Sequence, residues 1–570
     1  MTPAKPLHTL ASLSAVDIAI IGLYFGAVIL LGILLKRKVR TGEDFFIAGR
    51  EMTAWIAGLS FVAANMGALE LMGWAAGTYQ YGMLAMHWYW VGAIPAMIFL
   101  ALVMMPFYYI SKTHSVPGYL KLRFGESTRA LSALSFAGMT ILVSGINMFA
   151  MAKVMEVILG WNLTFSIGIS SATIAVYVTL GGLTSAIFNE VLQFVLIWLG
   201  ALVVPILGLA ECGGYDGLRN RILHDASLPN GFLHLWTNTA HFSANPMGIH
   251  WTGIVFGLGF VGAFGYWTTD FLVVQRVIAA KDLRSAQMAP IIGAFFKLLV
   301  PFIVILPGLI GVAVLAGENA GRGLLPESTA LAGQHTYNEV LPLLLVRYAP
   351  PGLLGLGITA LIAGFMSGMA GNISAFSTVW TYDLYRPLLR SNETDAHYLA
   401  IGRWSTVGGV LVSMGAAYLA MRFNSIMDYV QALFSILVTP LFGTIILGML
   451  WKRATPAAGF WGLLAGIASS LGMWLWVRQV PSALSIIALS PDAEPMAENL
   501  YRMLWSWLVC VLVTVGLSLL TKPQPESELR GLVYGCTNLP QQKQYPLVYR
   551  PAFWGCAVLF VFLYLQWLFR

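Results

Sequence analysis

The sequence is poor in charge, and this excludes most classes of soluble protein. Of its 570 residues only 10% are charged, whereas 58% are hydrophobic. Soluble domains carry about 25% charged residues, and about 20 consecutive apolar residues suffice to cross a bilayer. The composition therefore indicates an integral membrane protein with many spans. We assign the net charge of +7 to the loops between spans, and we expect no nucleic-acid partner.

Cysteine and enzyme motifs are also scarce. The four cysteines, at positions 212, 510, 536 and 556, form no C-x-x-C pair, so we expect neither a cysteine-based metal site nor a disulfide framework. No H-E-x-x-H, G-x-S-x-G or paired-histidine pattern stands at the end of an apolar run, which argues against an enzyme. The first apolar run lacks a small-residue cleavage site and ends in the basic triplet 36–38. We therefore expect a retained span there and no signal peptide.

Hydropathy divides the chain into about 14 transmembrane helices. Their approximate limits are 15–35, 53–76, 82–109, 130–152, 163–181, 187–209, 251–274, 288–315, 353–381, 400–420, 427–451, 457–477, 501–520 and 553–569. Lysine and arginine collect in alternate loops, beginning with the loop after the first span, and the positive-inside rule makes those loops cytoplasmic. We therefore expect a multi-pass protein of the inner or plasma membrane, with both termini extracytoplasmic.

The spans between 53 and 209 and those between 251 and 451 form two groups of five. Two groups with an odd number of spans have opposite orientations in the membrane, as in inverted-repeat transporters. The segment 15–35 then precedes the first repeat, and the segment 457–569 adds three C-terminal helices. We expect one transmembrane transporter domain over residues 1–570.

The segment 53–76 contains residues that interrupt a membrane helix. Asn65 and Gly67 are poor residues for a helix interior, and Glu70 is costly inside a membrane. Such residues are tolerated where unwound backbone lines a polar cavity. We expect a broken helix here; a kinked packing helix is the alternative. The corresponding helix of the second group, 251–274, has four glycines before Tyr266, which suit either a break or close helix packing.

Few other ionisable residues lie within the predicted spans. Lys297 is deep in its span and needs an acceptor, and Glu70 is the obvious candidate; the alternative is that Lys297 extends to an interface. For Lys153 extension to an interface is the preferred interpretation. Asp270 could pair with Arg276, and His87 could belong to the aromatic group around it.

A small polar stretch, 367–374, interrupts the apolar span 353–381. Its Ser367 hydroxyl, together with carbonyls freed by the break at 63–66, would form an oxygen cage for a hard monovalent cation. Small residues at a helix–helix contact are the competing explanation.

Several motifs, in order along nearly the whole chain, resemble the solute:sodium symporter superfamily. The stretches 42–50, 63–65 and 180–193 resemble the superfamily, and the stretches 213–216, 266–270, 274–276, 521–525 and 532–535 resemble its sodium–glucose cotransporter branch. The resemblance implies an all-α fold with a LeuT-type 5+5 inverted repeat, a broken first helix in each repeat, and alternating access.

The resemblance also implies roles for individual residues. It assigns Asn65, Lys297 and Gln431 to sugar binding and Tyr266 to closing the sugar site. It assigns the coupling sodium ion to a second set of positions, namely Ala63, Met66, Gly364, Ser367 and Gly368. Glu190 corresponds to the acidic residue thought to line the exit path of sodium.

The chain also departs from the family pattern. Glu70 stands where sugar-binding relatives carry a glutamine or another polar residue, and Tyr89 stands where they carry a glutamate. Gly368 replaces the second sodium-binding serine, which removes one oxygen ligand. These departures leave the fold expectation unchanged but bear on the identity of solute and ion.

We therefore predict a sodium-coupled symporter that imports a sugar or a sugar-like neutral solute. Asn65, Glu70, Lys297 and Gln431 would bind hydroxyl groups, Tyr89 would replace the usual carboxylate, and Tyr266 or Trp74 would stack on an apolar ring face. The expected partners are sodium, a small solute and lipid, without an obligate protein partner. The alternatives are a proton-coupled or non-sugar carrier in which Glu70 titrates, and a transporter-like sensor, against which no output domain follows the last predicted span.

Overall fold

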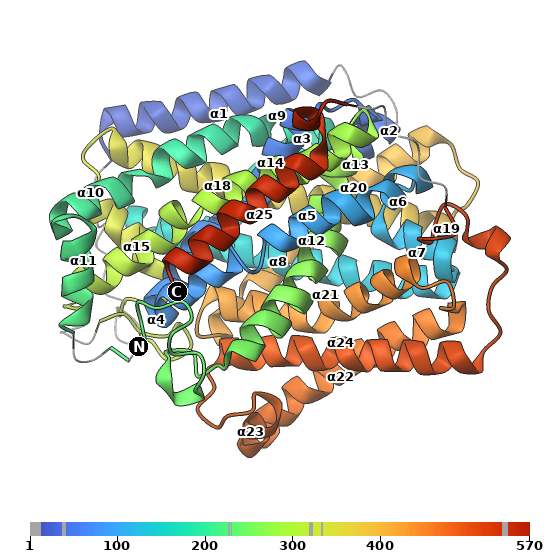
Figure 1. The fold of residues 1–570 in the computed structure, drawn as a ribbon. Coiled ribbons are helices and arrows are strands. Elements are labelled where there is room, and N and C mark those ends of the chain that lie inside the picture. Colours follow the sequence, from blue (N-terminus) through green and yellow to red (C-terminus); the bar gives the residue numbers. More distant parts are fainter. Residues whose placement is uncertain are drawn as a thin grey trace.

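The computed structural model describes residues 13–36, 42–225, 228–229, 231–317, 323–331, 334–537 and 545–570 (Figure 1). Over these residues the fold is helical, and the only β pairing is two isolated bridges, Met52 with Ala280 and Leu325 with Thr336.

Many of the helices follow one another with short connections, but a longer stretch, 224–252, separates α11 from η5. The α-helices are α1 (Ala15–Lys36), α2 (Gly42–Ile47), α3 (Ala54–Asn65), α4 (Ala68–Tyr81), α5 (Ile94–Phe99), α6 (Met105–Ser111), α7 (Val116–Phe124), α8 (Glu126–Leu159), α9 (Leu163–Ala201), α10 (Val203–Cys212), α11 (Gly214–Leu223), α12 (Ala263–Thr269), α13 (Phe271–Ile278), α14 (Leu283–Leu299), α15 (Pro301–Val314), α17 (Val340–Tyr348), α18 (Leu353–Val379), α19 (Arg386–Leu388), α20 (Asp395–Ala417), α21 (Ile426–Leu450), α22 (Pro456–Gln479), α23 (Leu484–Ile487), α24 (Pro495–Leu520) and α25 (Pro551–Leu568). Short 3₁₀ or π segments are η1 (Ala48–Arg50), η2 (Gly82–Trp88), η3 (Leu100–Met104), η4 (Phe242–Ala244), η5 (Gly253–Gly262), η6 (Tyr337–Glu339), η7 (Trp380–Tyr385), η8 (Ala420–Arg422), η9 (Pro481–Ala483), η10 (Glu526–Leu529) and η11 (Leu547–Tyr549).

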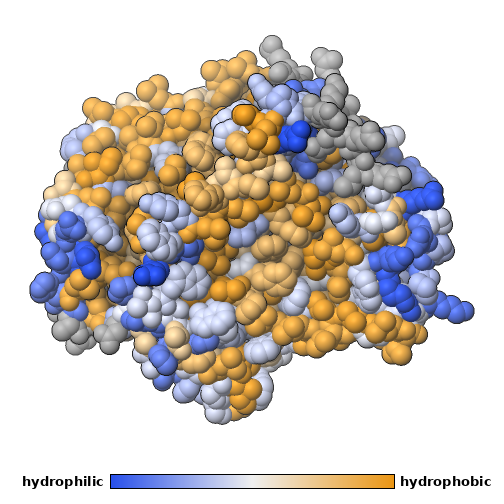
Figure 2. All heavy atoms as spheres, viewed as in Figure 1, coloured by the Kyte–Doolittle hydropathy of each residue, from blue (hydrophilic) through white to orange (hydrophobic). Residues whose placement is uncertain are grey.

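The helices have the length and the surface expected of a membrane protein. Among the described residues, 11 helices are long and apolar enough to cross a bilayer, and two bent helix pairs bring the number to 13. Figure 2 shows apolar side chains across the middle of one face, while hydrophilic side chains gather at its left and right ends. The long helices α1, α22 and α24 run between these ends (Figure 1). An apolar band between two polar ends fits a bilayer.

Three of the predicted spans, 82–109, 163–181 and 187–209, differ from the helices. The segment 82–109 was expected to be one span, but η2 and a turn occupy its first part and the apolar helix runs from Ile94 to Ser111. The interval between the predicted spans 163–181 and 187–209 is helical, because α9 continues from Leu163 to Ala201. A count of 14 spans therefore stays a prediction.

Both predicted broken helices are bent. The pair α3 and α4 with η2 bends by 54°, and the pair η5–α12 and α13 bends by 50°. The first break falls at Met66 and Gly67. The second falls at Asp270, whose carboxylate accepts the backbone N–H of Leu272 (2.9 Å) and so caps α13. The glycines before this break serve close packing: a Cβ at Gly257 would lie 2.4 Å from the Leu500 carbonyl oxygen of α24.

The two bent pairs lie in the centre of the bundle. The helix α3 packs on α14, α9 and α18, and α12 packs on α21. The helix α1 lies outside α9 and α18 and is attached to α18 by Asp17, which accepts the backbone N–H groups of Gly352 and Gly355 (2.8 and 2.7 Å). The helices thus surround the two breaks, where backbone groups lack their intrahelical partners.

Candidate functional site

A cavity lies beside the two breaks, with about 860 Å³ of space between its atoms when its open part is included. All seven side chains predicted to bind solute line it: Asn65, Glu70, Trp74, Tyr89, Tyr266, Lys297 and Gln431. They come from α3, α4, the turn after η2, α12, α14 and α21.

An ion pair crosses this cavity. The Lys297 ammonium lies 2.9 Å from the Glu70 carboxylate, and it also donates to the side-chain oxygen of Asn65. Lys297 is 1% exposed and Glu70 8%. The predicted pair is therefore confirmed, and Lys297 does not extend to an interface. Burying each ion costs several kcal/mol of desolvation, and the attraction between the two charges offsets that cost.

Aromatic rings enclose the pair. The Lys297 ammonium lies 5.1 Å from the ring centre of Tyr89 and 5.4 Å from that of Trp267, within reach of a cation–π interaction. Tyr266 accepts a hydrogen bond from the Asn65 amide (2.7 Å) and stacks on Phe434, with ring centres 5.1 Å apart. The cavity thus combines a few fixed polar groups with flat apolar walls.

The carboxyl end of α3 meets α18 next to this cavity. The Ser367 hydroxyl donates to the Ala63 carbonyl oxygen (2.8 Å). Gly364 and Gly368 allow the close approach, since a Cβ at Gly364 would lie 3.0 Å from the Met66 carbonyl oxygen. The five positions assigned to sodium by resemblance therefore lie at one helix crossing, where small residues allow close packing. Free carbonyls at a helix carboxyl end favour a cation.

Glu190 belongs to a separate, fully buried cluster. Its carboxylate pairs with the Arg276 guanidinium (2.5 Å) and accepts the Ser60 hydroxyl. Asp270, which could have paired with Arg276, instead caps α13, and the Arg276 guanidinium pairs with Glu190. Ser60 lies one helical turn before Ala63. The Arg276 guanidinium lies 3.2 Å from the position that a Cβ of Gly371 would occupy, and Gly371 lies one turn after Ser367. Glu190 therefore lies one turn from the helix crossing.

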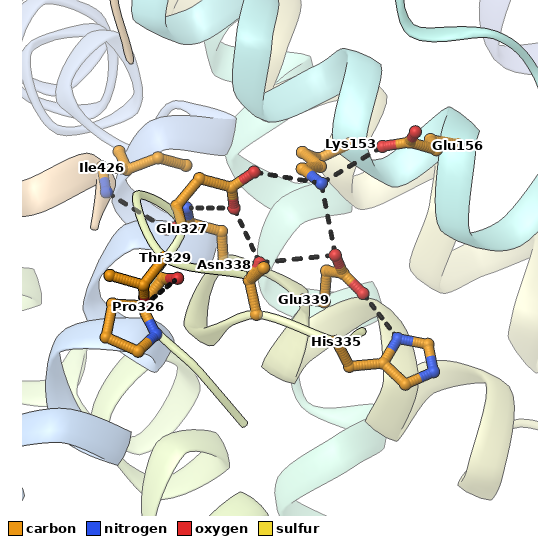
Figure 3. A network of polar contacts seen from close by, with 10 residues as sticks. Lys153, Glu156, Pro326, Glu327, Thr329, His335, Asn338, Glu339 and Ile426 are labelled. Carbon is orange, nitrogen blue, oxygen red and sulfur yellow. Dashed lines mark hydrogen bonds and ion pairs between the residues drawn. The ribbon is translucent and has the colours of Figure 1, made fainter. Parts of the chain in front are cut away.

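A second charged cluster holds the loop before α17 (Figure 3). Lys153 of α8 pairs with Glu156, Glu327 and Glu339, each at 3.2 Å. The predicted extension of Lys153 to an interface is therefore wrong. Asn338 donates to Glu327 (3.0 Å) and accepts the backbone N–H of Ile426 (3.1 Å), which joins the loop to α21. We call Lys153, Glu156, Glu327, Asn338 and Glu339 the Lys153 clamp.

Sequence reasoning missed several residues of the site. Trp267, Phe434 and Asn147 line the cavity but were not singled out. The signal for Asn147 is a polar residue in the middle of the apolar span 130–152. His87 does not line the cavity; its ring packs 4.3 Å from that of Trp236 and bonds to the Leu235 carbonyl oxygen.

Comparison with known proteins gives one consistent result. The model of the sodium:solute symporter family matches residues 45–466. The chain is 30% identical over 556 residues to the human sodium/glucose cotransporter 4, covering 94% of this chain and 81% of that protein. It is 31% identical over 472 residues to the sodium/mannose cotransporter of Bos taurus, covering 80% and 78%. It is 29% identical to the sodium/myo-inositol cotransporter 2 of Oryctolagus cuniculus, covering 94% and 81%.

A solved structure shares the fold. It is a substrate-bound, outward-open Na⁺-coupled sialic acid symporter, with a TM-score of 0.72 and 20% sequence identity, covering 90% of this chain and 99% of that chain.

Proposed function

The chain belongs to the sodium:solute symporter family, and from this premise we propose that it imports a neutral polyhydroxy solute, a sugar or a cyclic polyol. It is a sodium-coupled transporter of a small solute and not an enzyme. The similarity to glucose, mannose and myo-inositol cotransporters supports the class of solute.

The observation that carries the proposal is the Lys297–Glu70 pair in an aromatic cavity. The pair offers hydrogen-bond donors and acceptors, yet its charges cancel at 2.9 Å, so no opposite charge is demanded of the solute. Asn65 and Gln431 add neutral amides, and Tyr266, Trp74 and Trp267 offer flat apolar faces for a ring. A charged solute would have to break the pair and leave one buried charge uncompensated.

The coupling ion belongs at the crossing of α3 and α18. The carbonyl oxygens of Ala63, Met66 and Gly364 and the Ser367 hydroxyl are a donor set that suits sodium, and the proposed exit path of the ion passes Glu190. Bound there, sodium would hold the break of α3 against α18. Solute and ion sites share this break, which gives a physical route for coupling.

We also propose the complete architecture. It has 14 spans: an extra helix at 15–35, a first repeat at 53–209, a second and inverted repeat at 251–451, and three further helices within 457–569. The two bends, of 54° and 50°, at the start of each group support this repeat. We place the protein in the plasma or inner membrane with both termini outside.

Uptake of radiolabelled hexoses and inositols into proteoliposomes tests the function. We expect accumulation that requires an inward sodium gradient, is lost when potassium replaces sodium, and survives a proton ionophore. Uptake indifferent to sodium and abolished by the ionophore would instead support the proton-coupled alternative. Uptake of organic anions in preference to all neutral sugars would reject the solute class.

A further inference from the structure

The Gly368 position lacks the side-chain oxygen that the family pattern places beside Ser367, and a side chain from another helix fills its space. A Cβ at Gly368 would lie 3.3 Å from the side-chain oxygen Oδ1 of Asn147, and a Cβ at Gly67 would lie 3.0 Å from the same atom. Asn147 belongs to α8, so its amide reaches the gap between the break of the first bent helix and α18.

The orientation of this amide is fixed. Its nitrogen donates to the Val143 carbonyl oxygen one turn earlier on α8 (3.3 Å), so the oxygen Oδ1 points away from that carbonyl. Asn147 is 2% exposed, and its Oδ1 is a buried atom with no hydrogen-bond partner. A buried acceptor without a partner costs about 1–3 kcal/mol, and such an atom calls for an explanation.

A cation at the helix crossing would supply the missing partner. The Asn147 oxygen lies beside the Cβ positions of both Gly67 and Gly368, and Gly368 directly follows Ser367 in α18. Amide and carbonyl oxygens are ligands of hard cations. We infer that Asn147 is a sodium ligand that replaces the missing serine hydroxyl at position 368. This inference rests on the proposed function, because it takes sodium as the coupling ion.

Direct sodium binding to the purified protein, without solute, tests the inference. We measure the midpoint of sodium-dependent thermal stabilisation and ²²Na⁺ binding, with choline as the replacement ion. We expect sodium affinity to fall by about 10- to 100-fold in Asn147→Ala. If Asn147→Ala folds poorly, the bulkier Asn147→Leu takes its place, with the same expected loss. Asn147→Asp keeps an oxygen and adds a charge, so it should bind sodium more tightly than the parent.

Two matched controls sharpen the test. Asn189 of α9 has the same local geometry, with its amide nitrogen on the carbonyl four residues earlier and its buried oxygen without a partner; Asn189→Ala should leave sodium affinity unchanged. In the Asn147→Ala background, Gly368→Ser should restore most of the affinity, whereas Gly368→Ala, which adds the same Cβ without a hydroxyl, should not.

The outcomes separate this inference from the proposed function. If the parent binds no sodium, the proposed function is wrong. If the parent binds sodium and Asn147→Ala and Asn147→Leu bind it equally well, only the role of Asn147 is rejected. Equal rescue by Gly368→Ala and Gly368→Ser would also reject it, since the effect would then be one of packing.

Discussion

At the scale of single residues, the buried pair of Lys297 and Glu70 dominates the site. Both side chains are almost fully enclosed and 2.9 Å apart, so each depends on the other for its charge. The pair also takes part in a chain of contacts through Asn65 to Tyr266. A change at any member therefore reaches Tyr266, the residue that the resemblance assigns to closing the cavity.

Removing one charge of the pair should be worse than removing both. We expect Glu70→Gln and Lys297→Met each to abolish uptake and to lower the free energy of unfolding by about 3–5 kcal/mol, because an uncompensated buried charge remains. The double variant should be more stable than either single variant, although still inactive. Melting temperatures in detergent measure this. Melting temperatures of the single variants equal to that of the parent would contradict it.

Solute selectivity should depend on where the carboxylate lies. Tyr89 faces Lys297, with the ammonium 5.1 Å from its ring centre. The double variant Glu70→Gln/Tyr89→Glu moves the carboxylate from position 70 to position 89, where the resemblance to the family places it in sugar-binding relatives. We expect it to shift the ratio of uptake towards glucose or galactose relative to the parent. Competition assays with a panel of hexoses measure the ratio, and Tyr89→Phe serves as the control that adds no carboxylate.

At the scale of helices, close packing positions the breaks. The helix α9 crosses α18 so closely that a Cβ at Gly200 would lie 2.5 Å from that of Ala360 and 2.6 Å from the Leu356 carbonyl oxygen. Gly168, in the same helix, has nothing within 4 Å of its Cβ position. These two glycines form a matched pair for measuring the contact.

We expect Gly200→Ala to lower stability by about 1–3 kcal/mol through overpacking, and to reduce uptake by shifting α18. Gly168→Ala should be neutral or stabilise the protein by at most about 1 kcal/mol, since alanine is the better helix former. Thermal unfolding followed by tryptophan fluorescence compares the two. An equal change in stability for the two variants would contradict close packing between α9 and α18 at Gly200.

The Lys153 clamp should respond to acid. Burial alone raises the pKa of Glu339, but the hydrogen bond from His335 and the Lys153 charge outweigh burial and hold that pKa below its ordinary value of 4.5. The folded state thus binds the proton less well than the unfolded state. The contribution to stability is present above pH 4.5 and is lost as the pH falls below it.

We therefore expect parent protein to lose thermal stability on acidification below pH 4.5, and Glu339→Gln to lose less of it. Hydrogen exchange in the segment 334–348 should rise over the same range in the parent, because the loop is released from α8 and α21. An equal acid sensitivity of parent and variant would assign the effect to other carboxyl groups.

At the scale of the whole molecule, an apolar band separates two polar ends (Figure 2). Thr329, next to the Lys153 clamp, and Ser391, after α19, are both exposed. The proposed topology places Thr329 outside the cell and Ser391 inside. The four native cysteines can be replaced to make labelling specific.

In a cysteine-free background we expect Thr329→Cys to react with a membrane-impermeant maleimide on intact cells. Ser391→Cys should react only after permeabilisation. Both variants should retain uptake, because neither residue lines the cavity. Reaction of Ser391→Cys on intact cells would invert the proposed orientation.

Much of this protein follows from its sequence alone. Low charge and long apolar runs determine a helical membrane protein, because buried backbone in lipid requires internal hydrogen bonds. Asn65 and Gly67 predict the first break, since both weaken a helix locally. The deep charges Glu70 and Lys297 predict a pair, since neither can remain alone in an apolar interior.

Other features were decided by tertiary structure. Asp270 is close to Arg276 in the sequence and could have paired with it. Arg276 instead pairs with Glu190 of α9, which is 86 residues away in the sequence, because the fold brings that carboxylate into the interior. Lys153 was expected at an interface, yet the loop before α17 surrounds it with carboxylates. The amide of Asn147 gained its place beside Gly368 in the same way. Local composition determines where a helix weakens and which charges need a partner, but the partner itself is selected by the packing of distant helices.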